Sequence, residues 1–292
     1  MEAKLGVEIL NIENDLYPEM LRKIKNPPKK LYVCGNKMAL NSNCISIVGS
    51  RTNTKYGEKW CKKFVKEFIN YGVTIVSGMA LGIDKIAHES AINNGGTTIA
   101  VMPSGFNNIY PKENLKLYEQ IISSGGCVIT EYNPNEKASS KKFLERNRIV
   151  SGISIATIVV EAAYRSGTSV TAKLANEQER DVYCIPGSLD NPKSIGTNKL
   201  IKEFAKITLS PNDVLENYKF LHKKDKIITT DIQSMPKEYE EIYENITDIP
   251  ISTNEIAKKI NADLKEIISK LTMLELDGKI RKIAGDRYIR SE

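Results

Sequence analysis

The sequence contains few of the residues on which metal and nucleophilic chemistry usually depend. It has only two histidines, His88 and His222, and neither belongs to an HExxH motif or a cysteine–histidine cluster. A zinc site or a Ser-His-Asp triad would therefore have to depend on His88 alone. A lone histidine is more often a hydrogen-bonded helix residue than a catalytic base. We accordingly expect no catalytic residue, no metal and no cofactor, and we favour binding over catalysis.

Cysteine usage and the lack of long apolar runs exclude further classes. Five cysteines occur at scattered positions with no CxxC pair, which is typical of a reducing compartment and not of a disulfide framework. No apolar run approaches the roughly 18 residues of a membrane-spanning helix. The N-terminal residues include acids where a secretory signal would have a basic start. We expect a cytoplasmic protein with no membrane partner.

Short and long apolar segments alternate from about residue 44 onward. Six nearly continuous apolar runs predict strands buried on both faces, at 44–50, 73–78, 97–105, 127–132, 156–162 and 181–187. Segments with helical periodicity separate or follow them, at 55–71, 82–94, 111–124, 142–154 and 168–179. This repetition favours right-handed crossovers and a mainly parallel sheet with helices on both faces. The sequence thus predicts a Rossmann-like α/β domain at 44–220, after a short N-terminal prefix at 1–43 with an edge strand in KLYVCG.

Glycine and serine follow most of the predicted strands. Five of the six strands end in or lead into VGSR, SGMALG, MPSG, YRSGT and IPGS. The carboxyl ends of parallel strands meet at one edge of the sheet, here called the carboxyl edge, where ligands of such folds bind. Short loops of this kind can point backbone N–H groups at an anion. They match neither GxxxxGK[ST] nor GxGxxG, which argues against nucleotide hydrolysis and hydride transfer.

The composition changes near residue 220. A polar segment at 221–236 is predicted to link two domains, and 237–292 combines three helical patterns with a short hairpin that turns at Gly-Asp. Ser252 or Thr253 is expected to cap the second of these helices and Asp263 the third. Three helices and a two-stranded wing predict a small C-terminal winged-helix domain.

The net charge of +6 is unevenly distributed. Residues 1–220 contain 29 Lys and Arg against 22 Asp and Glu, a net charge of +7, whereas 221–292 contain 13 against 14, a net charge of −1. The third helix of the winged domain has more acidic than basic residues, so it lacks the electrostatic attraction of a DNA-contacting helix. We predict that this domain contacts protein, with weak DNA contact through Arg281, Lys282, Arg287 and Arg290 as the alternative.

The segment from Lys137 to Arg148 has a local excess of positive charge. It contains five basic residues against the single acid Glu145, with Phe143 inside the basic run. Single-stranded nucleic acid needs this combination, because Lys and Arg neutralise phosphates while an aromatic ring stacks on a base. The alternative is a solvated helix face with Phe143 in the core. A position after the fourth strand, at the carboxyl edge, favours the nucleic-acid interpretation.

Two further elements at this edge have anion-binding residue types. Arg51 follows the first strand, and its guanidinium can hold a phosphate bidentately, although pairing with Asp84 is an alternative. The residues RSGT begin the helix after the fifth strand, where they can form an anion nest beside Lys173. A simple N-cap would use the same residues.

Several motifs together resemble the DNA processing protein A family, also called DprA or Smf. They are YPEMLRKIKNPPKKLYVCG, IVGSR, SGMALGIDKIAHESAI, FLERNRIVSGIS, VVEAAYRSGTSVTAKLANEQERDVYCIPGS and IGTNKLI, and they span Tyr17 to about Asn198. The resemblance implies an extended Rossmann fold in a cytoplasmic, non-enzymatic homodimer. It also implies binding of single-stranded DNA and loading of the RecA recombinase onto incoming strands during natural transformation.

The resemblance also assigns site residues position by position. It places a phosphate pocket at Ser50, Arg51, Gly78, Met79, Ser166, Gly167, Thr168 and Lys173. It makes Phe143 the base-stacking ring, with Lys141 or Lys142 on the DNA backbone and Asn147 and Arg148 in the pocket wall. Leu144 stands where the family more often has proline, so we expect a less rigid entry into that helix.

The rival class is a nucleotide-binding enzyme of the phosphoribohydrolase-like Rossmann group. Related folds use a PGGxGT loop to cleave N-glycosidic bonds, and RSGT occupies the corresponding place. Such an enzyme needs a carboxylate for general acid–base catalysis. No acid follows Thr168 until Glu177, and Glu161 is the remaining candidate. We therefore favour a binding protein.

Overall fold

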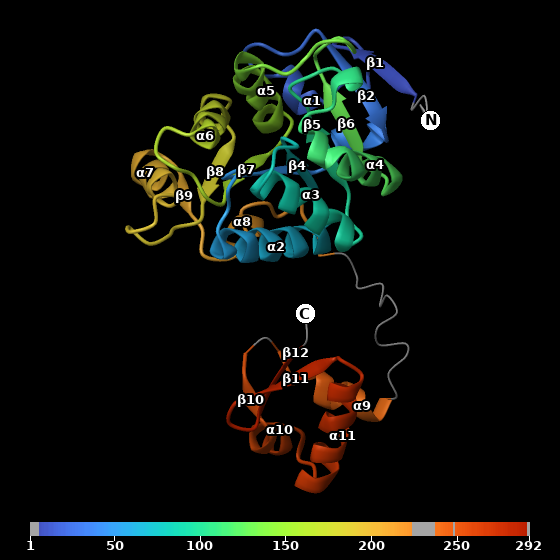
Figure 1. Cartoon of the computed structure of the whole chain (residues 1–292), viewed down its shortest axis with the longest axis vertical. Coiled ribbons are helices and arrows are strands. Elements are labelled where there is room, and N and C mark those ends of the chain that lie inside the picture. The colour runs from blue at the N-terminus through green and yellow to red at the C-terminus, as the bar shows by residue number, and fades with distance from the viewer. Residues whose placement is uncertain (1–5, 224–236, 248, 291–292) are drawn as a thin grey trace. The chain divides into compact units, whose positions relative to one another are not determined.

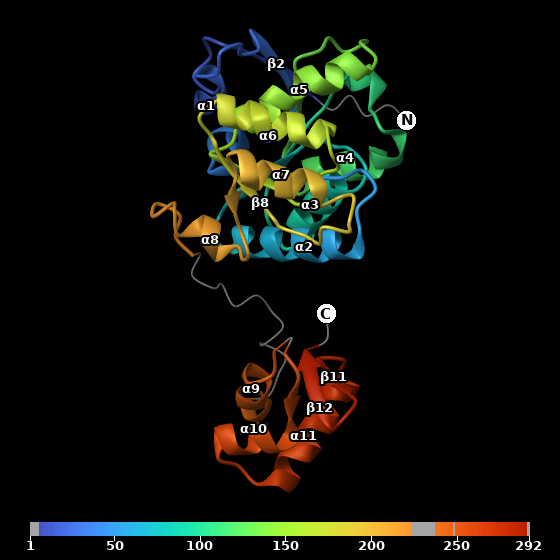
Figure 2. The same ribbon diagram turned by 90° about the vertical axis from the view of Figure 1, so that its left-hand side faces the viewer.

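The computed structural model describes residues 6–223, 237–247 and 249–290. Contacts within the chain divide it into two compact units, Met1–Lys224 and Asp225–Glu292. Figures 1 and 2 show the ribbon of each unit from two directions. Most of the linker predicted at 221–236 lies outside the described residues.

A nine-stranded sheet forms the centre of the first unit, in the order β1-β2-β6-β5-β4-β3-β7-β8-β9. Its strands are β1 (Val7–Asn11), β2 (Lys30–Gly35), β3 (Cys44–Val48), β4 (Thr74–Ser77), β5 (Thr98–Val101), β6 (Cys127–Thr130), β7 (Ala156–Val159), β8 (Asp181–Cys184) and β9 (Lys206–Ile207). The seven strands from β6 to β9 in the sheet order pair parallel with their neighbours. Strand β2 pairs antiparallel with both β6 and β1. The predicted mainly parallel sheet is confirmed, and each of its six predicted strands is present.

Helices cover both faces of this sheet (Figures 1 and 2). One face carries α2 (Lys55–Asn70), α3 (Ile83–Asn93), α4 (Leu115–Ser123) and α8 (Asn212–Leu215), and the other carries α1 (Glu19–Arg22), α5 (Ser140–Gly152), α6 (Gly167–Glu177) and α7 (Ile195–Glu203). Ile45 and Ile47 of β3 belong to the same cluster as Phe64 of α2, whereas Val48 packs in the cluster of Val150 of α5. Alternate side chains of a doubly covered strand thus serve two cores, which explains the continuous apolar runs.

The N-terminal segment belongs to the sheet. β2 pairs with β6 on one side and β1 on the other, so β1, and not the segment KLYVCG, forms this edge. Tyr17 is fully buried and its hydroxyl donates a hydrogen bond of 2.7 Å to the carbonyl of Pro28. Leu21 and Ile24 pack against Gly152 at the end of α5. Residues 6–43 are therefore an integral layer of the α/β unit.

The second unit combines three helices with a small antiparallel sheet. Its elements are α9 (Lys237–Glu244), β10 (Ile251–Ser252), α10 (Thr253–Ile260), α11 (Leu264–Leu276), β11 (Ile280–Ile283) and β12 (Arg287–Arg290). Ser252 and Glu255 form a capping box at the start of α10, and the Asp263 carboxylate accepts from the backbone of Lys265 at the start of α11. This is the predicted winged-helix fold, with β10 as a third strand beside β12.

His88 and the five cysteines are buried in the first unit. The five cysteines are free thiols in the core. Nδ1 of His88 lies 2.7 Å from the hydroxyl of Thr98, and burial lowers the pKa of the ring to about 3. His88 is therefore a neutral core residue. Among the described residues, no cluster of three potential metal ligands occurs and no helix is long and apolar enough to cross a membrane.

Candidate nucleic-acid interface

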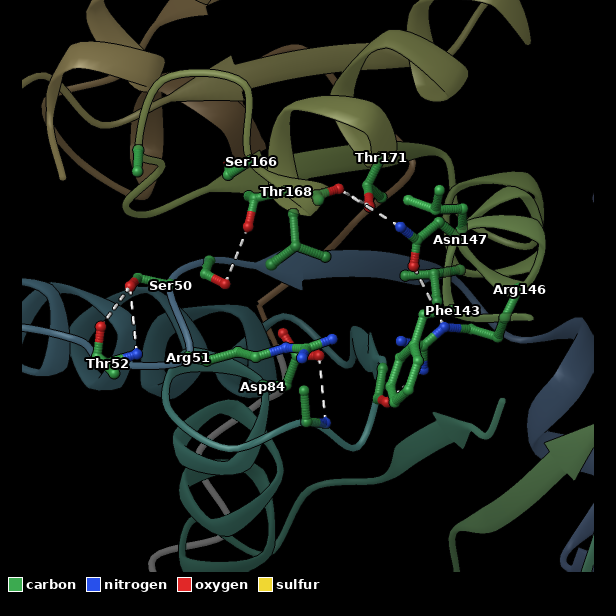
Figure 3. Close-up of a pocket in the computed structure, with 18 residues that line it drawn as sticks. Ser50, Arg51, Thr52, Asp84, Phe143, Arg146, Asn147, Ser166, Thr168 and Thr171 are labelled. Carbon is green, nitrogen blue, oxygen red and sulfur yellow. Dashed lines mark hydrogen bonds between the residues drawn. The ribbon is translucent and has the colours of Figure 1, made fainter. Parts of the chain in front are cut away.

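A pocket of about 440 Å³ opens at the carboxyl edge of the sheet (Figure 3). It lies beside the neighbouring strands β3 and β7. The strands that follow β3 in sequence, β4 to β6, add to one side of the sheet, and those that follow β7, β8 and β9, add to the other. The loops after two such strands diverge, which creates the crevice in which open α/β sheets bind ligands. The walls come from the loops after β3, β4 and β7, from the start of α6 and from one face of α5.

Hydroxyl groups join the two loops that frame the pocket. Thr168 donates through Oγ1 to the carbonyl of Gly49 over 3.0 Å, which connects the start of α6 to the loop after β3 (Figure 3). Ser166 caps α6 by accepting from the backbone N–H of Ser169. Ser50 accepts from the backbone N–H of Thr52 over 3.2 Å. The base of the pocket is therefore polar and held in place by hydrogen bonds.

One face of α5 forms the opposite wall. Phe143, Arg146, Asn147 and Val150 all line the pocket, as expected for residues spaced by three, four and seven along a helix. The side-chain amide of Asn147 donates to the carbonyl of Gly167 over 3.4 Å and its oxygen accepts from Nε of Arg146 over 3.3 Å. Asn147 therefore connects α5 to the start of α6.

Arg146 lines the pocket, although it was not predicted as a site residue. It is one of the five basic residues from Lys137 to Arg148. Its side chain is 3% exposed, and Nη1 donates to the carbonyls of Gly78 and Val101. A Cβ on Gly78 would lie 2.6 Å from both Nη2 of Arg146 and Oδ2 of Asp84, so only glycine fits between these two side chains. Burial lowers the pKa of Arg146 to about 10 and raises that of Asp84. Arg146 is three residues after Phe143, and this helical spacing already indicates in the sequence that both side chains lie on the same face of α5.

Arg51 and Phe143 meet at the mouth of the pocket. The guanidinium carbon of Arg51 lies 4.7 Å from the centroid of the Phe143 ring, a cation–π arrangement (Figure 3). The ring of Tyr110 contacts Phe143 edge-on, with centroids 5.6 Å apart. Phe143 is half-buried and Tyr110 is exposed. The mouth therefore presents one cation and two aromatic rings next to the polar interior.

The structure places eight of the thirteen predicted site residues in the pocket wall. They are Ser50, Arg51, Gly78, Phe143, Asn147, Ser166, Gly167 and Thr168. Met79 is fully buried at a positive φ of 61°, and its carbonyl accepts from the side chain of Asn114. Lys173 is exposed on α6 and is absent from the described lining of the pocket.

The two lysines at the start of α5 also lie outside the wall. Lys141 is exposed and its ammonium is 3.5 Å from Glu145. Lys142 is 2.8 Å from the Glu136 carboxylate and lies over the ring of Tyr132 at 4.8 Å from its centroid. Both lysines belong to α5, which lines the pocket through other residues, but neither lines the pocket itself. If they contact a DNA backbone, they do so outside the pocket.

The expectation that Arg148 lines the pocket is wrong. Its Nη2 is 2.6 Å from the Glu131 carboxylate, with both side chains largely buried. Two positions separate Arg148 from Arg146, a rotation of roughly 200° around a helix, so the two side chains face opposite sides of α5. Arg148 instead connects α5 to the loop after β6.

Glu161, the candidate acid of the enzyme alternative, is bound to Thr54 outside the pocket. It is 1% exposed, and its carboxylate accepts from the backbone N–H of Thr54 over 3.0 Å and from the hydroxyl of Thr54. Glu161 is absent from the described lining of the pocket. Its contacts stabilise the start of α2.

Comparisons with known proteins show the family to which the chain belongs. The family model of DNA recombination-mediator protein A matches residues 8–219. Protein Smf of Escherichia coli is 35% identical over 97% of this chain and 77% of its own length, and DNA processing protein DprA of Streptococcus pneumoniae is 40% identical over 72% and 74%.

Two solved structures are similar. That of DNA processing protein A from Streptococcus pneumoniae has a TM-score of 0.69 and 39% identity, covering 74% of this chain and 75% of that one. That of DNA processing protein A from Helicobacter pylori, which concerns the single-stranded DNA binding mode of that protein, has a TM-score of 0.67 and 31% identity, covering 76% of this chain and all of that one. The resemblance drawn from the motifs is confirmed, and the chain belongs to the DNA processing protein A (DprA/Smf) family of DNA recombination mediators.

Proposed function

We propose that this protein binds single-stranded DNA at the carboxyl-edge pocket, protects incoming strands and loads RecA onto them during natural transformation. The observation on which this depends is the Arg51–Phe143 pair at the mouth of a hydroxyl-lined pocket. Arginine supplies a phosphate contact, and the phenylalanine ring supplies a stacking surface for a base. The family membership and the DNA-binding relative from Helicobacter pylori support the same ligand.

A single strand suits the pocket better than a duplex does. Stacking on Phe143 requires a base that is free of its neighbours, which a duplex provides only at the cost of unpairing. The pocket volume of about 440 Å³ is of the size that holds a small ligand and not a helix 20 Å wide, an approximate B-DNA diameter. Arg51 lines the pocket and is exposed, and Lys141 is exposed at the start of α5, so both can neutralise the backbone.

Stacking and phosphate contacts are largely independent of base identity. Every base has a π-face, so Phe143 can accept any of the four. We therefore expect binding that tolerates any base sequence and falls steeply with salt.

We further propose a cytoplasmic homodimer whose winged-helix unit contacts protein. Helix α11 exposes Leu264, Ile268 and Leu276, which is unlike a basic DNA-contacting helix. In the wing, Lys282 is paired with Asp286 at 2.6 Å, and the guanidinium of Arg290 lies over the ring of Tyr243. These contacts favour a protein partner for this unit over a phosphate backbone.

Fluorescence anisotropy with a labelled dT oligonucleotide and a matched duplex tests the DNA proposal, at two salt concentrations. We expect much tighter binding of the single strand, and weaker binding by Arg51→Ala and Phe143→Ala. Equal affinity for duplex and single strand, or no effect of either substitution, would contradict the proposed site.

RecA loading is tested separately with RecA and DNA coated by single-strand-binding protein. The protein should shorten the lag before RecA hydrolyses ATP, and a chain that ends at residue 224 should do so less well if the winged helix contacts RecA. An unchanged lag with the full chain would reject mediation while leaving DNA binding intact.

A further inference from the structure

A second group of cations surrounds an aromatic ring beside the pocket. Tyr164 is 49% exposed, and Nζ of Lys199 and the guanidinium carbon of Arg165 lie 4.6 Å and 5.2 Å from its ring centroid. We call Tyr164, Arg165 and Lys199 the α6–α7 cluster. None of the three belongs to the site predicted from the sequence.

The cluster is continuous with the pocket wall. The backbone N–H of Ser166 donates to the carbonyl of Ala163 over 3.3 Å, which closes a turn with Tyr164 and Arg165 at its tip. Ala163 and Ser166, the two ends of the turn, both line the pocket. The two tip residues are therefore at its rim and exposed to solvent.

Helix α7 is fixed against the same turn. The backbone N–H of Gly196 donates to the carbonyl of Ala162 over 2.8 Å, and a Cβ on Gly196 would lie 2.5 Å and 2.6 Å from the carbonyl oxygens of Ala162 and Ala163. This close approach brings Lys199, one turn along α7, over the ring of Tyr164. Figure 2 shows α6 and α7 side by side in the first unit.

The charges of the cluster are incompletely balanced. Glu203 is 3.6 Å from Lys199, both side chains being exposed, whereas Arg165 makes no ion pair within the described parts of the chain. Arg165 also has a φ of 53°, a left-handed conformation that is uncommon outside glycine and asparagine. Two like charges held near one ring repel each other, and an anion between them would relieve that repulsion.

We propose that the α6–α7 cluster binds the phosphodiester backbone of the strand where it leaves the pocket, with Tyr164 as the residue that positions the two cations. The inference rests on the proposed function, and it adds a second cation–aromatic group beside the pocket to the Arg51–Phe143 pair. Arg165 belongs to the turn whose two ends line the pocket, and Lys199 lies over the ring of Tyr164 in that same turn. We therefore expect both cations to contact a nucleotide adjacent to the one inside the pocket.

Titrations with dT oligonucleotides of about 6 and about 20 nucleotides test this extension. Lys199→Ala and Arg165→Asn should weaken binding of the longer strand and lower the slope of log K against log salt by about 0.7 each, with little change for the shorter one. Asparagine is chosen at 165 because it accepts the left-handed backbone. Tyr164→Ala should act in the same direction, and Tyr164→Phe, which keeps the ring, should restore binding.

Lys63→Ala is the matched control, because Lys63 lies over the ring of Trp60 at 5.0 Å from its centroid but belongs to α2. It removes one charge from a cation–aromatic pair and should leave both titrations unchanged. If the cluster variants bind the longer strand like the wild type while Arg51→Ala loses affinity, the cluster proposal is rejected and the proposed function stands. If the wild type does not bind either strand, both are rejected.

Discussion

The guanidinium carbon of Arg51 lies over the Phe143 ring, 4.7 Å from its centroid, although the two residues belong to the loop after β3 and to α5. The groups proposed for phosphate and for base are thus in contact before any DNA is bound. Exposed cation–π pairs are worth about 0.5–1 kcal/mol. The pair can therefore be expected to act as one unit.

A double-mutant cycle measures the coupling free energy between Arg51 and Phe143 in DNA binding. Phe143→Ala should weaken binding of oligo-dT by about 1–3 kcal/mol with little change in salt dependence, and Arg51→Ala should weaken it and flatten the salt slope. The double variant should lose less than the sum of the two, by about 0.5–1 kcal/mol, because each residue positions the other. A loss larger than the sum would mean that the pair separates on binding.

Replacing Gly78 with alanine should destabilise the fold, whereas replacing Gly167 with alanine should not. Gly78→Ala places a methyl group 2.6 Å from Arg146 and Asp84, which are both buried, so it should cost about 1–3 kcal/mol of unfolding free energy. Gly167→Ala meets no atom within 4 Å and should change stability by less than about 0.5 kcal/mol. Urea denaturation of the two variants makes the comparison. Equal stabilities would show that Arg146 and Asp84 move aside.

Arg148→Ala should destabilise the fold without changing the salt slope of DNA binding. The substitution leaves Glu131 without its partner in a largely buried place, which costs about 1–3 kcal/mol. The free energy of unfolding and the salt dependence of oligo-dT affinity are measured on the same preparation. If Arg148→Ala flattens the salt dependence of affinity as Arg51→Ala does, Arg148 contacts a phosphate after all.

His88 should make the fold sensitive to acid. Burial lowers its pKa to about 3 from the ordinary value of about 6.5, so below pH 6.5 the unfolded chain binds a proton that the folded chain does not bind. The stabilising contribution is complete above pH 6.5 and is lost as the pH falls towards 3, by at most about 1.4 kcal/mol per pH unit. Denaturation between pH 7 and 5 should show a shallower pH dependence for His88→Asn than for the wild type.

His222→Asn is the control for that experiment, because His222 is exposed. It should retain the wild-type slope. If both variants behave alike, the acid sensitivity comes from carboxylates and not from His88.

The strands of the first unit were predictable because parallel strands covered on both faces have an unmistakable run of apolar residues. Val7–Asn11 was not predicted as a strand, since only Leu10 of its five residues is buried and the pattern has no continuous apolar run. Its partner in KLYVCG was predicted, but not that a further strand would pair on its outer side. Edge pairing depends on tertiary contacts that a local pattern does not contain.

The pocket was predicted in its loops but less well on α5. Treating Lys137 to Arg148 as one cationic segment ignored the direction of each side chain. Helical spacing from Phe143 indicates Arg146 and Asn147 as its neighbours and excludes Arg148, as the structure has it. The burial of Glu161 under Thr54 could not be predicted, because the two residues are 107 positions apart.

The hydrogen bond from Thr168 to Gly49 has a kinetic consequence. It joins the loop after β3 to the start of α6 across the crevice. We therefore expect the base of the site to keep its shape when a strand binds, without closure of a loop. Capture should then proceed at a rate set by diffusion and by the attraction of the positively charged unit, and it should slow as salt is added. The lifetime of the complex, by contrast, would be determined at the mouth, by how long a base stays on Phe143.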